Sequence, residues 1–314
     1  MKRFILAALA VSVMVSCSTD RGDDSTYYSE DNSVVKFSAG AISRVSVNVD
    51  GVDQWDKNDM IGISTTGFSS NYTNVLYLAT DEGLSTGFTS TTPILFPNVS
   101  SGTVNFNAYY PYDSEYDENG YIIVDVSEQQ NKYGSVDFMV AERDSFKYGS
   151  NENNSAAVEF DFSHKLAKVV ITVGLNDNLS SLEGLSVSVV DIYSKCGYSI
   201  EGSADSSYTP TTGTFDLTTT TDTAGYKTAT ITAILHPMAV GDCKDAKITL
   251  SVKENGKSYS VAFNENLAAG FQHNYKLDLG NDYPVFSGST IEEWSGKDSV
   301  ATELQPTETT TSGN

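Results

Sequence analysis

The sequence predicts an all-β protein made of antiparallel sheets that each bury one face. Apolar and polar residues alternate in many short segments, for example at 45–49, 104–110 and 169–173. An alternation of period two puts one face of a strand in the core and the other in water. Turn residues separate these segments, and Asn255-Gly256 indicates a hairpin because both residues tolerate positive φ. No long segment has the 3.6-residue apolar spacing of a helix, so β-sandwiches are expected.

The composition is that of an acidic globular protein. The 314 residues include 19 Lys and Arg and 41 Asp and Glu, for a net charge of −22, and 39% are hydrophobic. This hydrophobic fraction is too high for a disordered chain. The negative charge excludes nucleic acid as a partner, because phosphates bind clustered Lys and Arg, and it argues against adsorption to anionic membranes. The length suggests two domains.

Residues 1–16 have the pattern of a lipoprotein signal peptide. Lys2 and Arg3 precede an apolar run at 4–15 that is too short to span a membrane. The end of this run resembles a bacterial lipobox, in which Cys17 becomes the lipid-modified first residue of the mature protein. The alternative is a secretory signal that is cut elsewhere. Removal of the signal leaves 17 basic and 41 acidic residues, so the mature charge is −24.

The remaining chain is predicted to contain a tether, two sandwiches and a tail. Residues 17–33 are polar and acidic, which is typical of a flexible tether. A polar, Asn-rich linker separates two β-rich halves, an N-terminal sandwich at 34–155 and a C-terminal sandwich at 156–296. The pattern leaves open which sandwich contains residues 158–162. Residues 297–314 are Thr-rich and polar, so they predict a frayed tail.

Few side chains are arranged for catalysis or for metal binding. The histidines, His164, His236 and His273, are scattered along strand-like segments and are interpreted as structural. Cys196 and Cys243 could form one disulfide in an oxidising compartment, or they could stay as two buried thiols. Neither the Cys nor the His spacing is typical of a zinc site. The sequence therefore predicts no cofactor, no metal and no enzymatic activity.

A run of tyrosines is the candidate binding feature. Tyr109, Tyr112 and Tyr116 lie close together in the sequence, and exposed tyrosine rings can stack on sugars or anchor a protein partner. Tyr110 continues the apolar alternation of residues 104–110, so part of the run is expected to pack in the core. Core packing is favoured over a binding platform for this run.

Seven motifs occur in an order and spacing that resemble a known family. They are FSA at 37–39, WDKNDMIGI at 55–63, VNFNAYYPY at 104–112, FSHKLAKV at 162–169, LHP at 235–237, AGFQHNY at 269–275 and IEEW at 291–294. Together they span roughly residues 34–296. This ordered set resembles the fimbrillin-like family of Bacteroidales, the subunits of type V pili.

The resemblance implies two tandem transthyretin-like β-sandwich domains and a lipoprotein, palmitate-bearing at Cys17, that is displayed on the cell outer membrane. Family members assemble after an arginine-specific protease removes an N-terminal strand and a neighbouring subunit inserts a strand into the vacated groove. Arg44 matches the cleavage position. An uncleaved Arg44, as in an anchor or a non-polymerising member, is the alternative. The implied partners are other fimbrial subunits, the outer membrane through the lipid, and a host or bacterial surface ligand.

The tail bears on the position of the chain within a pilus. In stalk subunits of the family the C-terminal segment is the strand that is donated. Here Val300, Ala301 and Leu304 are the only apolar residues after Trp294, so the resemblance favours a tip or accessory subunit. The leading hypothesis is a structural and adhesive fimbrial subunit for cell adhesion. The alternative is a non-polymerising, glycan-binding surface lipoprotein.

Overall fold

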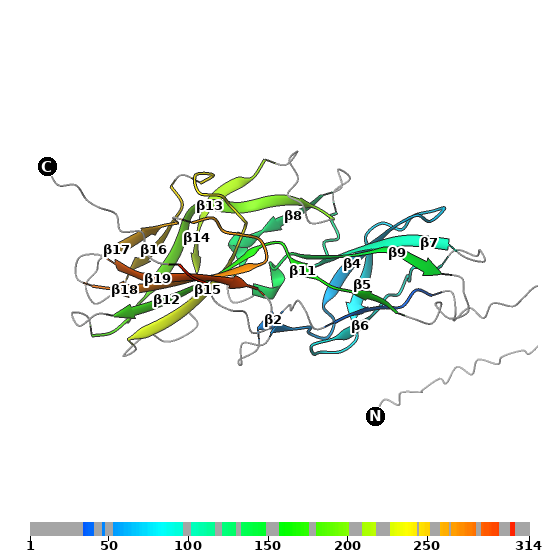
Figure 1. The fold of residues 1–314 in the computed structure, drawn as a ribbon, viewed down its shortest axis with the longest axis horizontal. Coiled ribbons are helices and arrows are strands. Elements are labelled where there is room, and N and C mark those ends of the chain that lie inside the picture. The colour runs from blue at the N-terminus through cyan, green and yellow to red at the C-terminus, as the bar shows by residue number, and fades with distance from the viewer. Residues whose placement is uncertain are drawn as a thin grey trace, which may run out of the picture.

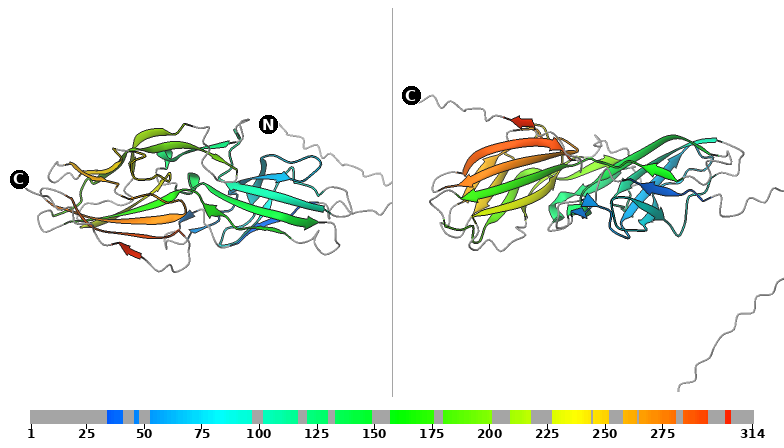
Figure 2. Two further views of the ribbon diagram at one scale, coloured as in Figure 1. Left: turned by 45° about the horizontal axis from the view of Figure 1, so that its top comes forward. Right: turned by 60° about the horizontal axis from the view of Figure 1, so that its bottom comes forward.

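The structure is a computed structural model that describes residues 34–40, 46–47, 53–96, 102–116, 121–129, 133–148, 157–175, 180–200, 209–217, 227–243, 245–251, 258–263, 265–280, 284–294 and 302–304. These residues form β-strands and two short 3₁₀-helices, η2 (Val126–Glu128) and η3 (Tyr133–Ser135). No α-helix occurs among them, and the predicted all-β class is confirmed. The strands form two lobes that lie end to end (Figure 1), and Figure 2 shows the same lobes from two further directions.

The first lobe is built from one eight-stranded sheet. Its order is β10 (Val158–Phe160), β1 (Phe37–Ala39), β6 (Thr86–Thr89), β5 (Val75–Ala79), β4 (Met60–Thr66), β7 (Gly102–Tyr110), β9 (Met139–Tyr148) and β11 (Ser163–His164). All neighbours in this sheet are antiparallel except β1 and β10, which run parallel. A separate ribbon pairs β2 (Ser46–Val47) with β3 (Asp53–Gln54).

This sheet curls around its own core. Three strands separate β1 from β7 in the sheet order, and adjacent strands lie about 4.8 Å apart. A flat sheet would therefore hold Phe37 and Phe106 far from each other. Their ring centroids are instead 5.2 Å apart, because the two strands face each other across a shared apolar interior.

The second lobe is a sandwich of two sheets. One sheet has the order β15 (Thr228–Leu235), β12 (Ala167–Leu175), β18 (Phe271–Leu279), β19 (Pro284–Glu293) and β20 (Thr302–Leu304). The other has the order β14 (Thr211–Leu217), β13 (Ser186–Ser199), β16 (Lys247–Ser251) and β17 (Ser258–Ala262), and β8 (Tyr121–Asp125) also pairs with β13. Alternate residues of the facing strands, such as Val169, Ile171 and Val187, are fully buried in one core.

The two cores divide the chain differently from the predicted boundary between residues 155 and 156. Ile122 and Val124 of β8 pack in the second core, because β8 pairs with β13. Val158, Phe160 and Phe162 pack in the first core, beside β1. Period-two alternation assigns a residue to one face of a strand, but it does not identify the sheet that the strand joins. Each lobe therefore contains a strand from the sequence assigned to the other.

Part of the predicted tail is an edge strand. Within residues 297–314, β20 pairs antiparallel with β19, and Thr302 lies opposite Ile291 and Leu304 opposite Ser289. Figure 2 shows β20 as the short red strand beside β19. The predicted signal peptide at 1–16 and tether at 17–33 lie outside the described residues. In the part that is described, no helix has the length and hydropathy needed to cross a membrane.

A buried polar contact lies at the waist between the lobes. His164 Nδ1 of β11 is 2.9 Å from Asp137 Oδ1, and both side chains are almost completely buried. The His164 ring also stacks on Trp294, at a centroid distance of 3.7 Å and an interplanar angle of 5°. Lys168 Nζ lies 5.8 Å from the centre of the same indole ring. These contacts join the end of the first sheet to the residue that follows β19.

His236 is buried in the second lobe, as the structural interpretation of the histidines anticipates. Its Nδ1 atom lies 2.8 Å from the Tyr198 hydroxyl oxygen. Burial lowers the pKa of His236 from 6.5 to about 4. The unfolded chain therefore binds this proton at a higher pH than the folded chain does. The neutral, folded His236 contributes stability that is fully present above pH 6.5 and is lost as the pH falls toward 4.

We expect His236 alone to make the free energy of unfolding measurably lower at acid pH. A pKa difference of this size corresponds to about 3 kcal/mol of the free energy of unfolding between pH 6.5 and pH 4. Urea unfolding of the wild type and of His236→Gln at pH 7, 5 and 4 isolates this contribution. The variant should lose less stability on acidification than the wild type. An identical loss in both proteins contradicts the assignment.

Candidate functional site

Strand β1 is an internal strand of the first lobe although it comes from the beginning of the described chain. Phe37 lies opposite Phe88 of β6 on one side and opposite Val158 of β10 on the other. Just upstream, the Val35 backbone N–H donates to the Ile94 carbonyl oxygen at 3.0 Å. Both edges of β1 are therefore paired. Removal of this strand would leave two neighbouring edges without their hydrogen-bonding partner.

The inward-facing side chains of residues 35–39 form part of the core of the first lobe. Val35, Phe37 and Ala39 are each 2–3% exposed and point to the same face, as period two requires. Burial of an apolar side chain the size of Val or Phe contributes about 1.5–3 kcal/mol. The segment thus acts as part of the core of the first lobe and not as a surface strand.

Phe37 occupies a site formed by three aromatic rings. Its centroid lies 5.0 Å from Tyr77 and 5.2 Å from Phe106, both in edge-to-face geometry, and 5.5 Å from Phe160 in a stacked geometry. The Tyr77 hydroxyl oxygen accepts a hydrogen bond from the Ile94 backbone N–H at 2.7 Å, which fixes this wall of the site. Burial raises the pKa of Tyr77 to about 12, so the ring stays neutral at physiological pH.

Two predicted site residues, Cys17 and Arg44, lie outside the described residues. Their place in the sequence still relates them to β1, because Cys17 precedes the strand and Arg44 follows it by five residues. Both the candidate lipid and the core strand therefore lie on the N-terminal side of the candidate cleavage site.

Tyr109 belongs to the protein interior, which corrects its assignment as a candidate binding aromatic. It is 0% exposed, and its hydroxyl donates to Asn74 Oδ1 at 2.7 Å. The backbone N–H of Asp113 donates to the same hydroxyl at 3.1 Å, so Tyr109 closes the turn that follows β7. A Cβ atom at Gly62 would lie 2.3 Å from the Tyr109 ring, so glycine is needed there. Burial raises the pKa of Tyr109 well above its usual range.

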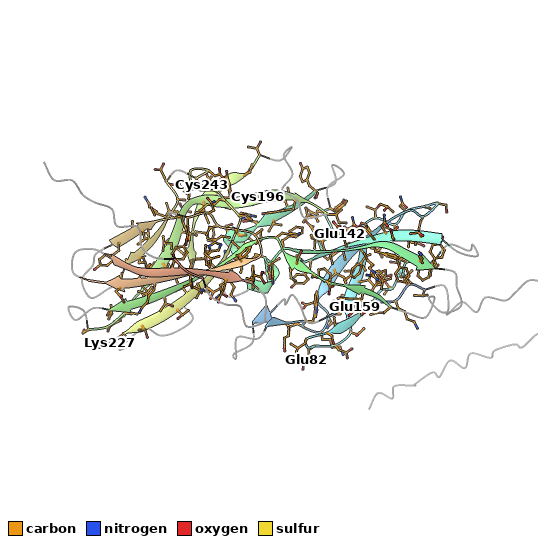
Figure 3. The ribbon with its side chains drawn as sticks, viewed as in Figure 1. Glu82, Glu142, Glu159, Cys196, Lys227 and Cys243 are labelled. Atoms are coloured by element: carbon orange, nitrogen blue, oxygen red, sulfur yellow. The ribbon has the colours of Figure 1, made fainter. Side chains whose placement is uncertain are left out.

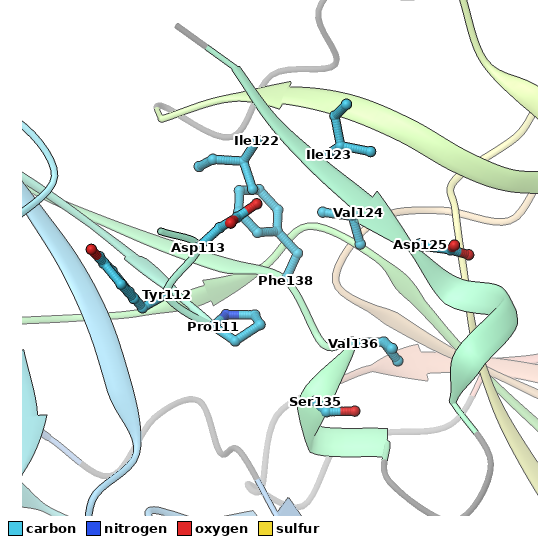
Figure 4. Close-up of a pocket in the computed structure, with 10 residues that line it drawn as sticks. All are labelled: Pro111, Tyr112, Asp113, Ile122, Ile123, Val124, Asp125, Ser135, Val136 and Phe138. Carbon is cyan, nitrogen blue, oxygen red and sulfur yellow. The ribbon is translucent and has the colours of Figure 1, made fainter. Parts of the chain in front are cut away.

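Tyr112 and Tyr116 are half-buried beside the second core, and Tyr112 lines a cavity at the waist. This cavity has a volume of about 190 Å³ and is shown in Figure 4. The residues that line it include Tyr112 and Phe138 together with the acidic Asp113 and Asp125. The cavity is therefore lined by both apolar and acidic residues. The role of Tyr112 and Tyr116 as binding aromatics stays a prediction.

The carboxylate of Asp125 at this cavity is already engaged by the protein. Lys195 Nζ lies 2.6 Å from Asp125 Oδ2, and the Ser127 hydroxyl donates to Oδ1 at 2.6 Å. Burial acts to raise the pKa of Asp125, but the hydrogen bonds from Lys195 and Ser127 outweigh it and hold the pKa below its ordinary value. Asp125 is consequently ionised at neutral pH.

Cys196 and Cys243 are both free thiols in the second lobe, and Figure 3 labels them. Cys196 is buried in β13, and its burial, together with the nearby Cys243, raises its pKa to about 12. The partly buried Cys243 also has a raised pKa because of burial. Neither thiol is activated as a nucleophile. A disulfide between them stays a prediction. No group of three His, Cys, Asp or Glu side chains within the described ranges is placed to hold a metal ion.

Comparison with known proteins identifies relatives of this fold. A candidate cell adhesion protein from Bacteroides uniformis matches with a TM-score of 0.67 and 24% identity, covering 84% of this chain and 99% of that chain. A second, from Bacteroides ovatus, matches with a TM-score of 0.65 and 20% identity over 84% of this chain and 99% of its own. The C-terminally truncated tip fimbrial protein Mfa3 from Porphyromonas gingivalis matches with a TM-score of 0.51 and 9% identity, over 82% of this chain and 100% of its own.

These identities are low enough that the solved structures establish the fold alone. No curated protein sequence matches the chain. The family model for fimbrillin-like proteins, in contrast, matches residues 43–294, which is most of the chain. This match spans both lobes, and it includes six of the seven sequence motifs. The chain therefore belongs to the fimbrillin-like family, whose members are structural adhesion proteins and not enzymes.

Proposed function

We propose that the chain is a tip or accessory subunit of a fimbrium, exported as an outer-membrane lipoprotein and assembled by strand exchange. The observation that carries this proposal is the position of β1, an internal core strand paired on both edges and located directly upstream of Arg44. Peptide-bond cleavage after Arg44 would separate β1 covalently from the rest of the lobe. Another chain could then supply the missing strand by β-augmentation.

The same cut would change how the protein is attached to the cell. A lipid on Cys17 anchors the uncleaved chain through the acidic residues of 17–33. Because Cys17 and β1 share the N-terminal side of Arg44, one cleavage releases the body of the protein from its lipid and opens the groove. The net charge of −24 on the mature chain favours solubility of the precursor until a strand is exchanged.

The C-terminal strand supports a tip or accessory position over a stalk position. β20 pairs with β19 of its own molecule and is only three residues long. The sequence around it, at 295–314, contains no aromatic residue and few apolar ones. A strand that is donated to a neighbour needs alternating apolar side chains to fill the groove of that neighbour.

Replacement of Arg44 tests the proposal directly. Arg44→Ala should keep the protein as a membrane-bound precursor and prevent its incorporation into fimbriae, as seen by immunoblotting of purified fimbriae. Arg21→Ala is the matched control, because it removes an arginine from the tether without touching the candidate cleavage site. The control should assemble normally. Incorporation of Arg44→Ala at the wild-type level would refute the proposed maturation.

The waist cavity favours a second function, the binding of a surface glycan. Tyr112 and Asp113 both line this cavity. A tyrosine ring can stack on a sugar, and a carboxylate can accept hydrogen bonds from the sugar hydroxyls. Titration of the uncleaved protein with a panel of oligosaccharides should then give a saturable change in tyrosine fluorescence that Tyr112→Ala abolishes. Absence of any saturable change across the panel would count against this function.

A further inference from the structure

The site of Phe37 is the most selective part of the groove that β1 occupies. Three rings contact it, two in edge-to-face geometry and one in a stacked geometry, and all three belong to residues that remain after β1 is removed. Phe106 and Phe160 are 0% exposed and Tyr77 is 1% exposed in the complete lobe. Loss of β1 leaves this apolar site open, and only another aromatic side chain restores all three ring contacts.

The two neighbouring positions in the groove limit the size of the side chains that an incoming strand can carry there. Val35 and Ala39 lie two residues before and after Phe37, on the same face of the strand, and both are buried. A side chain larger than alanine at the Ala39 position enters a packed interior, where overpacking is unfavourable. The groove therefore selects an extended segment with the inward pattern of a mid-sized aliphatic, an aromatic and a small residue.

We propose that the groove accepts a strand with this inward pattern, aligned parallel to β10, and that the donor is a different protein chain and not a second copy. This inference rests on the proposed strand exchange and specifies its partner. Parallel alignment is the direction of the strand that is replaced, since β1 runs parallel to β10 and antiparallel to β6. An incoming strand in that direction restores the hydrogen-bond pattern that β1 makes with both neighbours.

The C-terminal tail of this chain does not have the required pattern in any alignment. With Val300 at the Val35 position, Thr302 takes the aromatic site and Leu304 takes the site of Ala39. With Leu304 in the aromatic site, Pro306 takes the site of Ala39.

Proline has no N–H, so it interrupts a strand that is paired on both sides. With Ala301 in the aromatic site, Glu303 is buried without a countercharge at the site of Ala39. Residues 302–304 also already pair with β19 in the same molecule. A second copy of this chain is thus a poor donor through its tail.

Labelled peptides added to the full-length protein after cleavage by an arginine-specific protease test the proposal. The released strand is first removed in mild denaturant, and binding is measured by fluorescence anisotropy. The peptide of residues 34–44 should bind. Its Phe37→Ala form should bind at least about 100-fold more weakly, a difference of about 2.8 kcal/mol at 1.4 kcal/mol per factor of ten. The Phe37→Tyr form should stay within about tenfold, and Ser38→Ala is the matched control.

The outcomes separate this proposal from the strand exchange on which it rests. Equal binding of the 34–44 peptide and its Phe37→Ala form overturns the aromatic requirement alone. Binding of the 297–314 peptide as strong as that of 34–44, or homopolymers of the cleaved protein in mass photometry, overturns the assignment of a different donor chain. Failure of the 34–44 peptide to bind overturns both the proposed exchange and this inference.

Discussion

Replacement of Phe37 by alanine is expected to lower the free energy of unfolding of the first lobe by about 3–5 kcal/mol, the range for a buried Phe that becomes Ala. The substitution removes a 3%-exposed ring from contact with Tyr77, Phe106 and Phe160. The loss is large because the surrounding rings come from three different strands and cannot all close the cavity. Urea unfolding followed by tyrosine and tryptophan fluorescence measures the change.

Ser38→Ala is the control for this variant. Ser38 is in the same strand, but its partly exposed side chain points away from the core. Its replacement should change stability by no more than about 0.5 kcal/mol. A similar small change for Phe37→Ala would show that β1 does not contribute to the core. The displacement of β1 would then leave no groove with a preference for any partner.

Replacement of His164 by alanine is expected to cost about 3–5 kcal/mol, because it leaves the buried carboxylate of Asp137 without its partner. His164 Nδ1 lies 2.9 Å from Asp137 Oδ1, and the Asp137 side chain is 3% exposed. The variant also loses the stacking of the imidazole on Trp294. Thermal unfolding at pH 7 should show a clear decrease in Tm.

A double-variant cycle separates the buried charge from the lost stacking. His164→Ala combined with Asp137→Ala removes both partners, so no unpaired carboxylate remains. The double variant should be less destabilised than the sum of the two single variants, with a coupling energy of about 1–3 kcal/mol. Strict additivity would show that the two side chains do not interact in solution.

Much of the fold could be predicted from local alternation alone. The alternating segments at 104–110 and 169–173 lie within β7 and β12, where one face is regularly buried. The pairing of strands could not be predicted in the same way. β8 joins the second lobe and β10 the first because of long-range register, and period two contains no information on distant partners.

The end of β7 shows why the tyrosine run was only partly predictable. Alternation predicts that Tyr110 is buried and that Tyr109 faces water, but both are buried. Tyr110 packs in the first core and Tyr109 in the second, because this end of the strand lies between the two lobes. A strand with a core on each face loses the polar half of its pattern, so alternation alone places Tyr109 on the water-facing side, where the structure places packing.

The candidate site, too, could be predicted only in part from the sequence. Arg44 and the motif at 37–39 could be identified in the sequence, because the family resemblance rests on residues that are close together along the chain. The three rings around Phe37 could not be identified, since Tyr77, Phe106 and Phe160 meet only after the sheet has curled. This aromatic site is the feature that gives the groove its selectivity.

The N-terminal residue of the protein in assembled fimbriae tests the central claim, that β1 is removed and replaced during assembly. Fimbriae are sheared from cells that produce the wild-type chain, and their subunits are analysed by Edman degradation and intact mass spectrometry. We predict that the chain begins at Val45 and has lost both the lipid and residues 34–44. A chain in assembled fimbriae that begins at a lipid-bearing Cys17 would contradict this account.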